Sequence, residues 1–376
     1  MSIKDPIEYH RQLHGKITVI SKQKLDKENL GLAYTPGVGE ASKAIAADKG
    51  AVYELTGKQN MVAIVTDGTA VLGLGNIGPE AALPVMEGKA AIFADFAKVN
   101  AIPICLDTQD TEEIIKTVKN IAPAFGGINL EDIAAPRCFE IEKRLSEELD
   151  IPVFHDDQHG TAIVVLAGLI NALKVTGKDK TVKIVISGAG AAGLSIANLL
   201  AAYGLTNYCI CDSKGVISRD RTDVDDYKKL AVSKSTADCP AGKSSDALKG
   251  ADVLIGVSKP GQFTAADIKT MNKDAIVFAL ANPIPEIMPE EAYAGGAKIV
   301  ATGRSDFPNQ VNNALVFPGL FRGLLDNRTV KVTAELKIAI AEAIAGIVKQ
   351  PTAANIIPSI FEHEVVSTIA ATVANY

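Results

Sequence analysis

The chain has 376 residues, more than one hydrophobic core usually holds, so two domains are expected. Its net charge of −6 gives no basic field for phosphate backbones or anionic lipids, which excludes nucleic acids and membrane surfaces as expected partners and favours a small metabolite. With 47% hydrophobic and 5% aromatic residues, the composition is aliphatic and typical of the α/β class, in which helices cover buried parallel strands.

The first half alternates strand-like and helix-like runs, after a charged lead-in expected to be helical over residues 1–30 and a turn-rich loop, "YTPGVGEASKAI". Strands are predicted at 61–67, 101–107, 128–133 and 151–157. Helices are predicted at 80–99, 111–125, 135–149 and 160–176. This alternation implies that the strands pair in parallel.

A second alternating series begins with "KIVISGAGAAG", beyond the polar link "TGKDKTVK". We therefore expect an N-terminal α/β domain over residues 1–160 and a second domain over residues 161–376. The N-terminus lacks the apolar core of a secretory signal, and no uninterrupted apolar stretch approaches the length of a membrane span, so a cytoplasmic location is expected. The five cysteines are odd in number and lack CxxC spacing, which predicts buried thiols in a reducing compartment.

The glycine pattern G-x-G-x-x-G occurs twice, at Gly73-Gly75-Gly78 and at Gly188-Gly190-Gly193. Dinucleotide binding requires a strand before the glycines, a helix that starts within them, and an acid at the end of the next strand. The second copy has all three, because "TVKIVIS" precedes it, a helix-like run follows, and "NYCICD" ends in Asp212. The first copy lacks this context, so we interpret it as a tight structural loop.

The second copy therefore predicts a Rossmann-type cofactor site made by Gly188, Ala189, Gly190, Ala191, Ala192 and Gly193 together with Asp212. Asp212 would accept hydrogen bonds from the ribose hydroxyls and repel a 2′-phosphate, which favours NAD. Lys214 follows two residues later and could neutralise a phosphate, so NADP stays open as an alternative.

Two adjacent acidic pairs end strand-like runs: Glu131 and Asp132, and Asp156 and Asp157. In a parallel sheet such ends share one edge, so these oxygens can converge on a hard cation, Mg²⁺ or Mn²⁺. Two alternatives stay open at this point: the acids could merely complement the dipole of the following helix, or His155 and His159 could bind zinc. We disfavour zinc because that spacing works on a helix face and these residues are expected to precede the helix.

Seven segments in order resemble the malic enzymes, in particular the short bacterial and archaeal form. They are "YTPGVG" (34–39), "VTDGTAVLGLGNIGPEAALPVMEGKA" (65–90), "NLEDI" (129–133), "FHDDQHGTA" (154–162), "GAGAAG" (188–193), "FALANPIPEI" (278–287) and "ATGRSDFPNQVNNALVFPG" (301–319). The resemblance covers essentially the whole chain. It implies oxidation of L-malate to pyruvate and CO₂ with reduction of NAD or NADP, through oxaloacetate and with a divalent metal. It also implies decarboxylation of added oxaloacetate.

The resemblance also implies a role for each matching residue. Tyr34 would be the general acid and Lys89 the general base, with Asp156 tuning Lys89. Glu131, Asp132 and Asp157 would hold the metal. Asn282 and Asn313 would contact the substrate beside Lys89, and Asn282 would contact the cofactor as well. The N-terminal domain would then bind substrate and metal and the C-terminal domain would bind the dinucleotide.

One position departs from the family pattern. Longer members carry Glu-Arg where this chain has Thr69-Ala70, so the arginine that clamps a substrate carboxylate is absent. Anchoring is expected from Asn282, Asn313 and backbone N–H groups of residues 73–78, which would make the first glycine loop an anion cradle.

Several alternatives remain at this stage. The chain could act mainly as an oxaloacetate decarboxylase, or convert malate to lactate without net redox change. It could also be another two-domain dehydrogenase, resembling those of amino acids, or a non-catalytic NAD sensor. The resemblance further implies a homodimer, in which Tyr34 and Lys89 could act across subunits.

Overall fold

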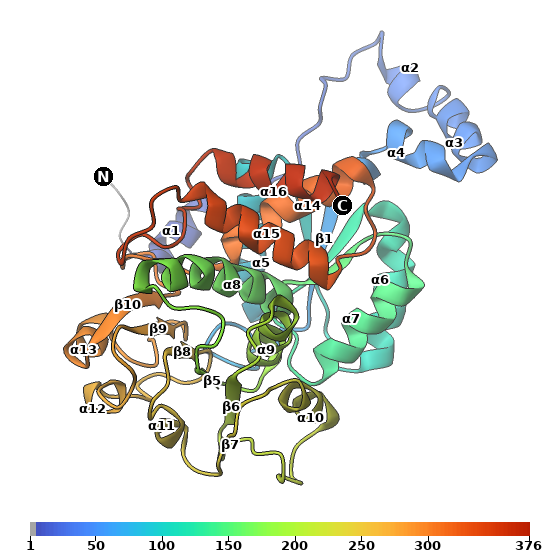
Figure 1. Ribbon diagram of the computed structural model, residues 1–376. Coiled ribbons are helices and arrows are strands. Elements are labelled where there is room, and N and C mark those ends of the chain that lie inside the picture. The colour runs from blue at the N-terminus through green and yellow to red at the C-terminus, as the bar shows by residue number, and fades with distance from the viewer. Residues whose placement is uncertain (1–4) are drawn as a thin grey trace.

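The computed structural model describes residues 5–376, and two sheets with parallel strands organise them (Figure 1). The first sheet has the order β2-β1-β3-β4 and every pair in it is parallel, as the sequence predicts. Its strands are β1 (Met61–Thr66), β2 (Asn100–Cys105), β3 (Gly127–Leu130) and β4 (Val153–His155). One face is covered by α6 (Thr111–Ile121) and α7 (Arg137–Glu148), and the other by α5 (Pro79–Ala97) and later helices.

The second sheet has the order β10-β9-β8-β5-β6-β7, in which the short β7 alone is antiparallel. Its strands are β5 (Ile184–Ser187), β6 (Tyr208–Asp212), β7 (Gly215–Val216), β8 (Val253–Gly256), β9 (Ala275–Ala279) and β10 (Ala297–Thr302). The intervening helices are α9 (Ala191–Tyr203), α10 (Asp226–Ser233), α11 (Ser244–Ala247), α12 (Ala265–Ile268) and α13 (Pro289–Ala294). The strand order changes direction beside β5, where ligands bind in such sheets.

Helix α8 (Asp156–Thr176) joins the two halves and is buried along most of its length. It packs on α9 and on α15 (Ala334–Ile347), while α14 (Phe317–Asn327) packs on α5 and on α16 (Glu364–Ala374). By length and composition α8 could cross a membrane, but 72% of its most apolar window is buried inside the protein. Its apolar character is therefore that of a core helix.

Two helix predictions need correction. Helix α8 begins at Asp156, four residues before the predicted start, because the two acids occupy its first turn, where they complement the helix dipole. The predicted lead-in helix over residues 1–30 is shorter: α1 covers Pro6–Leu13, and the β-branched run at residues 17–20 is not helical. Residues 1–4 lie outside the described part of the chain.

The segment after residue 20 stands out from the body of the molecule (Figure 1). It carries the short helices α2 (Leu30–Ala33), α3 (Val38–Ala47) and α4 (Val52–Leu55), and none of the three contains a buried residue. Its exposed apolar side chains include Leu32, 77% exposed, and Tyr34, 68% exposed.

The cysteine prediction is wrong in part. Cys209 on β6 and Cys239 form a disulfide with their Cα atoms 5.6 Å apart, whereas Cys105, Cys138 and Cys211 are free thiols. The chain leaves β6 through β7 and α10 and returns beside β6 thirty residues later, a proximity that spacing along the sequence cannot reveal.

Candidate active site

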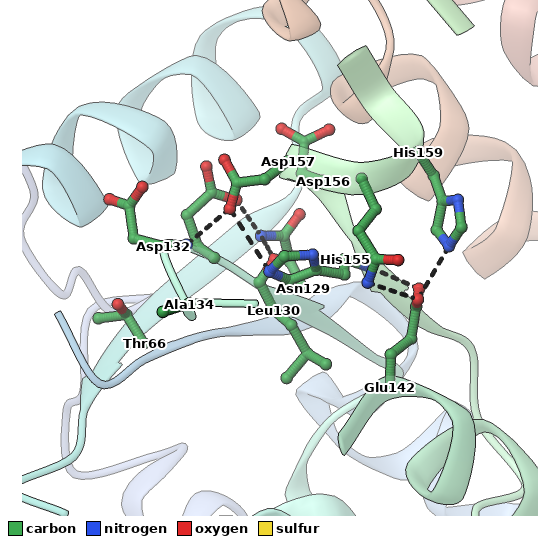
Figure 2. A network of polar contacts seen from close by, with 12 residues as sticks. Thr66, Asn129, Leu130, Asp132, Ala134, Glu142, His155, Asp156, Asp157 and His159 are labelled. Carbon is green, nitrogen blue, oxygen red and sulfur yellow. Dashed lines mark hydrogen bonds and ion pairs between the residues drawn. The ribbon is translucent and has the colours of Figure 1, made fainter. Parts of the chain in front are cut away.

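Three carboxylates converge at the carboxyl edge of the first sheet. Glu131 and Asp132 follow β3, and Asp157 lies in the first turn of α8, directly after the neighbouring strand β4. One oxygen from each lies within 4.8 Å of the others. The backbone N–H of Asp132 donates to Asp157 Oδ2 at 2.8 Å, which fixes one acid against another (Figure 2).

The acid cluster is electrostatically unfavourable without a cation. Burial, reinforced by Asp157 and Glu131, raises the pKa of Asp132 to about 9, and burial raises the pKa of Glu131 to about 7. Asp132 Oδ2 is buried with no hydrogen-bond partner. Three buried carboxylates with an unsatisfied oxygen fit a hard divalent cation, since such ions prefer oxygen ligands.

Lys89 lies beside this cluster, on the buried face of α5. Its Nζ is 2.7 Å from Glu131 Oε2 and also donates to Asp156 Oδ2. Burial alone would lower the pKa of Lys89, but the Asp156 and Glu131 carboxylates outweigh it and raise that pKa above the ordinary value. The ammonium also lies 4.1 Å from the ring centroid of Phe317, which leaves its remaining side apolar.

Asp156 and Asp157 point in different directions from the start of α8. Asp156 is fully buried against Lys89, and a Cβ at Gly160 would come within 1.8 Å of its Oδ1. The glycine of "FHDDQHG" is therefore required by the carboxylate one turn earlier. We expected an extended segment to separate the two acids, whereas the helix does so by its rotation of about 100° per residue.

The two histidines of this stretch support the site and do not join the acid cluster. His155 Nε2 lies 3.4 Å from Asp157 Oδ2, and burial lowers the pKa of His155 to about 4, so its ring is neutral. His159 Nε2 lies 2.8 Å from Glu142 Oε2 (Figure 2). Glu142 also accepts from the backbone N–H of His155 at 2.9 Å. Our reason for disfavouring zinc was wrong, because His159 lies inside α8 and His155 is its N-cap residue. Among residues 5–376, the candidate metal-ligand group consists of three carboxylates and contains neither histidine.

Lys89 and the acid cluster line one cavity of about 480 Å³. Asn282 and Asn313 line it as well, which brings both predicted substrate contacts to the predicted base. Gly73 forms part of the wall, and a Cβ there would lie 2.0 Å from the Asn282 carbonyl oxygen. The first glycine loop is thus part of this cavity and lies outside the dinucleotide fingerprint.

A second cavity, of about 500 Å³, follows the glycine fingerprint at the carboxyl edge of the second sheet. Gly188, Ala189, Gly190 and Asp212 line it. A Cβ at Gly193 would lie 1.8 Å from the Gly188 carbonyl oxygen, so the third glycine allows α9 to pack closely on the loop. Ala192 lines the first cavity, and Ala191, at the start of α9, lines neither of these two cavities.

The two cavities meet at Val257 and Ser258, which line both. These residues follow β8 and were not singled out from the sequence, although the rule that ligands bind beyond strand ends points to them. Glu286 is buried behind them and accepts from the backbone N–H groups of Ser258 at 2.6 Å and Ala281 at 3.0 Å. One carboxylate therefore connects a loop of the second cavity to the loop that carries Asn282.

Within a single chain, Tyr34 does not lie near Lys89 and the acid cluster, although the sequence predicts it as a catalytic residue. It lies in the projecting segment, and among the described residues it lines neither of these two cavities. Asn282, predicted to contact both the cofactor and the substrate, lines the cavity of Lys89 and is not among the residues that line the cavity of the glycine fingerprint.

Comparisons with known proteins identify the same family in both halves of the chain. The N-terminal domain of malic enzymes matches residues 14–146, and the malic enzyme NAD-binding domain matches residues 158–376. The bifunctional malic/malolactic enzyme of Bacillus subtilis is 53% identical over 382 residues, covering 100% of this chain and 93% of that protein.

Two further relatives differ in their cofactor. The NADP-dependent malic enzyme of Rhizobium meliloti is 48% identical and covers 93% of this chain but 46% of its own length. The crystal structure of the NAD-dependent malic enzyme of Thermotoga maritima superposes with a TM-score of 0.94 at 48% identity, covering 98% of this chain and 99% of that one.

Proposed function

Since the chain belongs to the malic enzyme family and catalyses the oxidative decarboxylation of malate with a nicotinamide dinucleotide, we propose that the cavity of Lys89 and the acid cluster is where this happens. The observation that carries the proposal is the shared wall at Val257 and Ser258. A substrate held beside Lys89 there faces a dinucleotide held by the glycine fingerprint.

Lys89 is the proposed general base for the C2 hydroxyl of malate. Its contacts with Asp156 and Glu131 hold its own proton, so it can act as a base once one of these carboxylates is neutralised. Glu131 contacts Lys89 and is also one of the three carboxylates of the acid cluster. Binding of a metal by Glu131 would therefore weaken its interaction with the Lys89 ammonium. Asp156 would remain as the partner that receives and returns the proton.

Glu131, Asp132 and Asp157 are the proposed ligands of Mg²⁺ or Mn²⁺, supported by their convergence and the raised pKa of Asp132. When bound, the cofactors supply a hydride acceptor and a Lewis acid that polarises the keto group. Asn282 and Asn313 would orient the substrate carboxylates, with backbone N–H groups of residues 73–78 as further donors in place of the missing arginine.

Tyr34 is the proposed acid that protonates the enolpyruvate carbon after CO₂ leaves, and we propose that a second copy of the chain supplies it. The support is its 68% exposure on a segment that also exposes Leu32 and Val38, since apolar patches of this kind mark interfaces. A homodimer would cover this segment and complete the site.

A mixed dimer tests this arrangement. Tyr34→Phe and Lys89→Ala chains are each expected to be nearly inactive, but co-expressed chains would form heterodimers with one intact site if Tyr34 acts in trans. Recovery of malate oxidation in the isolated heterodimer is the expected result. If the heterodimer remains as inactive as its parents, Tyr34 acts in cis or is not the acid.

For the cofactor, we propose NAD with NADP as an alternative, because Asp212 ends β6 in the dinucleotide cavity. We also propose the division into a substrate and metal domain over 1–160 and a dinucleotide domain over 161–376, and a cytoplasmic location. The family matches, which end at residue 146 and resume at 158, support the division.

The direct test is malate oxidation with NAD and NADP side by side, in Mn²⁺ and then in EDTA. Reduced nucleotide and pyruvate are expected with Mn²⁺ and neither with EDTA; activity that survives the chelator would contradict the metal site. The name of the Bacillus relative favours a second reaction, conversion of malate to lactate. Lactate formation without net nucleotide reduction, and decay of added oxaloacetate, measure the two alternatives.

A further inference from the structure

Asp212, the acid that ends β6, is held in an ion pair. Arg221 forms a two-pronged ion pair with Asp212, with Nη1–Oδ1 and Nη2–Oδ2 both at 2.9 Å. Both side chains are largely buried, 16% and 14% exposed, so this pair is ordered rather than a transient surface contact. Asp212 lines the cavity of the glycine fingerprint, whereas Arg221 is not among its lining residues.

Hydrogen bonding within the protein uses most of the capacity of Asp212. Its Oδ1 accepts from Arg221 and from the backbone N–H of Lys214 at 2.9 Å, and its Oδ2 accepts from Arg221. A carboxylate has about four lone-pair positions, so about one remains for a ligand. An unpaired acid at this place could take both ribose hydroxyls of NAD, whereas Asp212 can take one.

The charge around Asp212 is also balanced. Arg221 Nε and Lys214 Nζ both bind Asp223, at 2.9 and 2.6 Å, so two acids and two bases form one connected group. Its formal charge is zero. An acid at this position usually favours NAD because it repels the 2′-phosphate of NADP. Here the positive charges of Arg221 and Lys214 largely cancel the repulsion that Asp212, at the end of β6, would exert.

We propose that Arg221 sets the cofactor selectivity of this chain by allowing NADP to bind alongside NAD. With NAD, Arg221 stays paired with Asp212, which accepts a single ribose hydroxyl. With NADP, the 2′-phosphate replaces the carboxylate as the partner of the guanidinium, whose planar fork matches both groups. The proposal rests on the proposed function only in taking the cavity beside Asp212 as the adenosine end of the dinucleotide site.

The test measures binding of NADH and NADPH separately, by fluorescence titration, together with kcat/KM for NAD and NADP at saturating malate and Mn²⁺. The purified wild-type chain is expected to bind both nucleotides. Arg221→Gln should lower the affinity for NADPH relative to NADH by about tenfold or more, the size expected for lost charge-assisted hydrogen bonds. Affinity for NADH should rise, because Asp212 regains free lone pairs.

Two variants separate this role from simple support of the loop. Asp223→Asn removes one acid from the balanced group and should shift selectivity the opposite way, toward NADPH. Arg219→Gln is the matched control, since Arg219 lies on the same loop but donates to the Ser235 carbonyl oxygen, at 2.7 Å, and forms no ion pair with Asp212 or Asp223. Its ratio of NADPH to NADH affinity should equal that of the wild type.

Three results would overturn the proposal: a wild-type chain that does not bind NADPH, an Arg221→Gln chain that weakens both nucleotides equally, or a shift in Arg219→Gln as large as in Arg221→Gln. If Arg221→Gln does not fold, the sign of the Asp223→Asn shift decides. Failure of malate oxidation with both nucleotides would contradict the proposed function instead, and the binding titrations would still decide the role of Arg221.

Discussion

Removing one carboxylate from the acid cluster should abolish stabilisation of the protein by divalent cations. Asp132→Asn and Asp157→Asn each remove one of the three carboxylates whose oxygens lie within 4.8 Å of one another. In the wild type, Asp157 Oδ2 accepts a hydrogen bond from the backbone N–H of Asp132 at 2.8 Å. In Asp157→Asn the amide oxygen can still accept this hydrogen bond, so the local contact survives. The expected loss is therefore electrostatic.

The magnitude follows from mass action. A ligand at 100 times its Kd stabilises the native state by about 2.7 kcal/mol. For 376 residues the entropy of unfolding is roughly 0.8 kcal/mol/K, so Mn²⁺ at that concentration should raise the wild-type Tm by about 3 °C. Losing a group that only orients a metal ligand costs about 10–100-fold in affinity, so losing a ligand should cost more than about 100-fold and leave a shift below about 1 °C.

The assay is thermal unfolding with and without Mn²⁺, in EDTA-treated protein. Asp107→Asn is the matched control, since Asp107 is an exposed acid just beyond β2 at the same edge of the sheet but outside the cluster. It should keep the full wild-type shift. The reasoning is refuted if Asp132→Asn retains that shift, or if Asp107→Asn loses it.

Further changes test other parts of the site. Lys89→Ala should lower kcat for malate oxidation by about 10²–10⁴-fold, as expected for a general base, and a smaller loss in steady-state kinetics would exclude that role. Gly188→Ala should lower the Tm of the metal-free protein, because the φ of Gly188 is +124° and the new Cβ would lie 2.4 Å from the Val257 carbonyl oxygen. Gly190→Ala is the control, since a Cβ there meets nothing within 4 Å. Equal Tm values for the two variants would contradict this expectation. Glu142 has its pKa lowered from 4.5 to about 2 despite burial, by His159 and Lys337, so it stabilises the fold above pH 4.5 and this contribution is lost as the pH falls toward 2. Urea unfolding should therefore show Glu142→Gln destabilised by about 3 kcal/mol at pH 7, and a penalty that does not shrink by pH 3.5 would be inconsistent with the ion pair.

Many residues of the candidate site could be named from the sequence because they follow strand ends. Glu131, Asp132, Asp157 and Asp212 each lie at or within two residues of a strand end, and parallel strands bring such ends to one edge regardless of how the loops are built. The glycine fingerprints could be separated for the same reason, since only one lies between a strand and a helix of the right kind. At these positions the local sequence pattern and the order of strands in the sheet point to the same location.

The parts that the sequence did not reveal depend on contacts between distant segments. The partner of Asp212 is Arg221, on a loop whose path no periodic pattern specifies. The Cys209–Cys239 pair depends on the same returning chain. Tyr34 was predicted from its motif, but its place relative to Lys89 is not determined within one chain, because helices α2, α3 and α4 of its segment contain no buried residue among residues 5–376.

Helix α8 explains how the site combines polar chemistry with a rigid frame. Its first turn supplies Asp156 to Lys89 and Asp157 to the acid cluster, and its later turns are buried against α9, the helix that begins within the glycine fingerprint. One continuous element thus connects the predicted base and metal ligands with the cofactor loop. Because a helix cannot shift one end independently over this length, the distance between the acid cluster and the glycine fingerprint is fixed mainly by core packing. Glu286 adds a second connection, between Ser258 and Ala281.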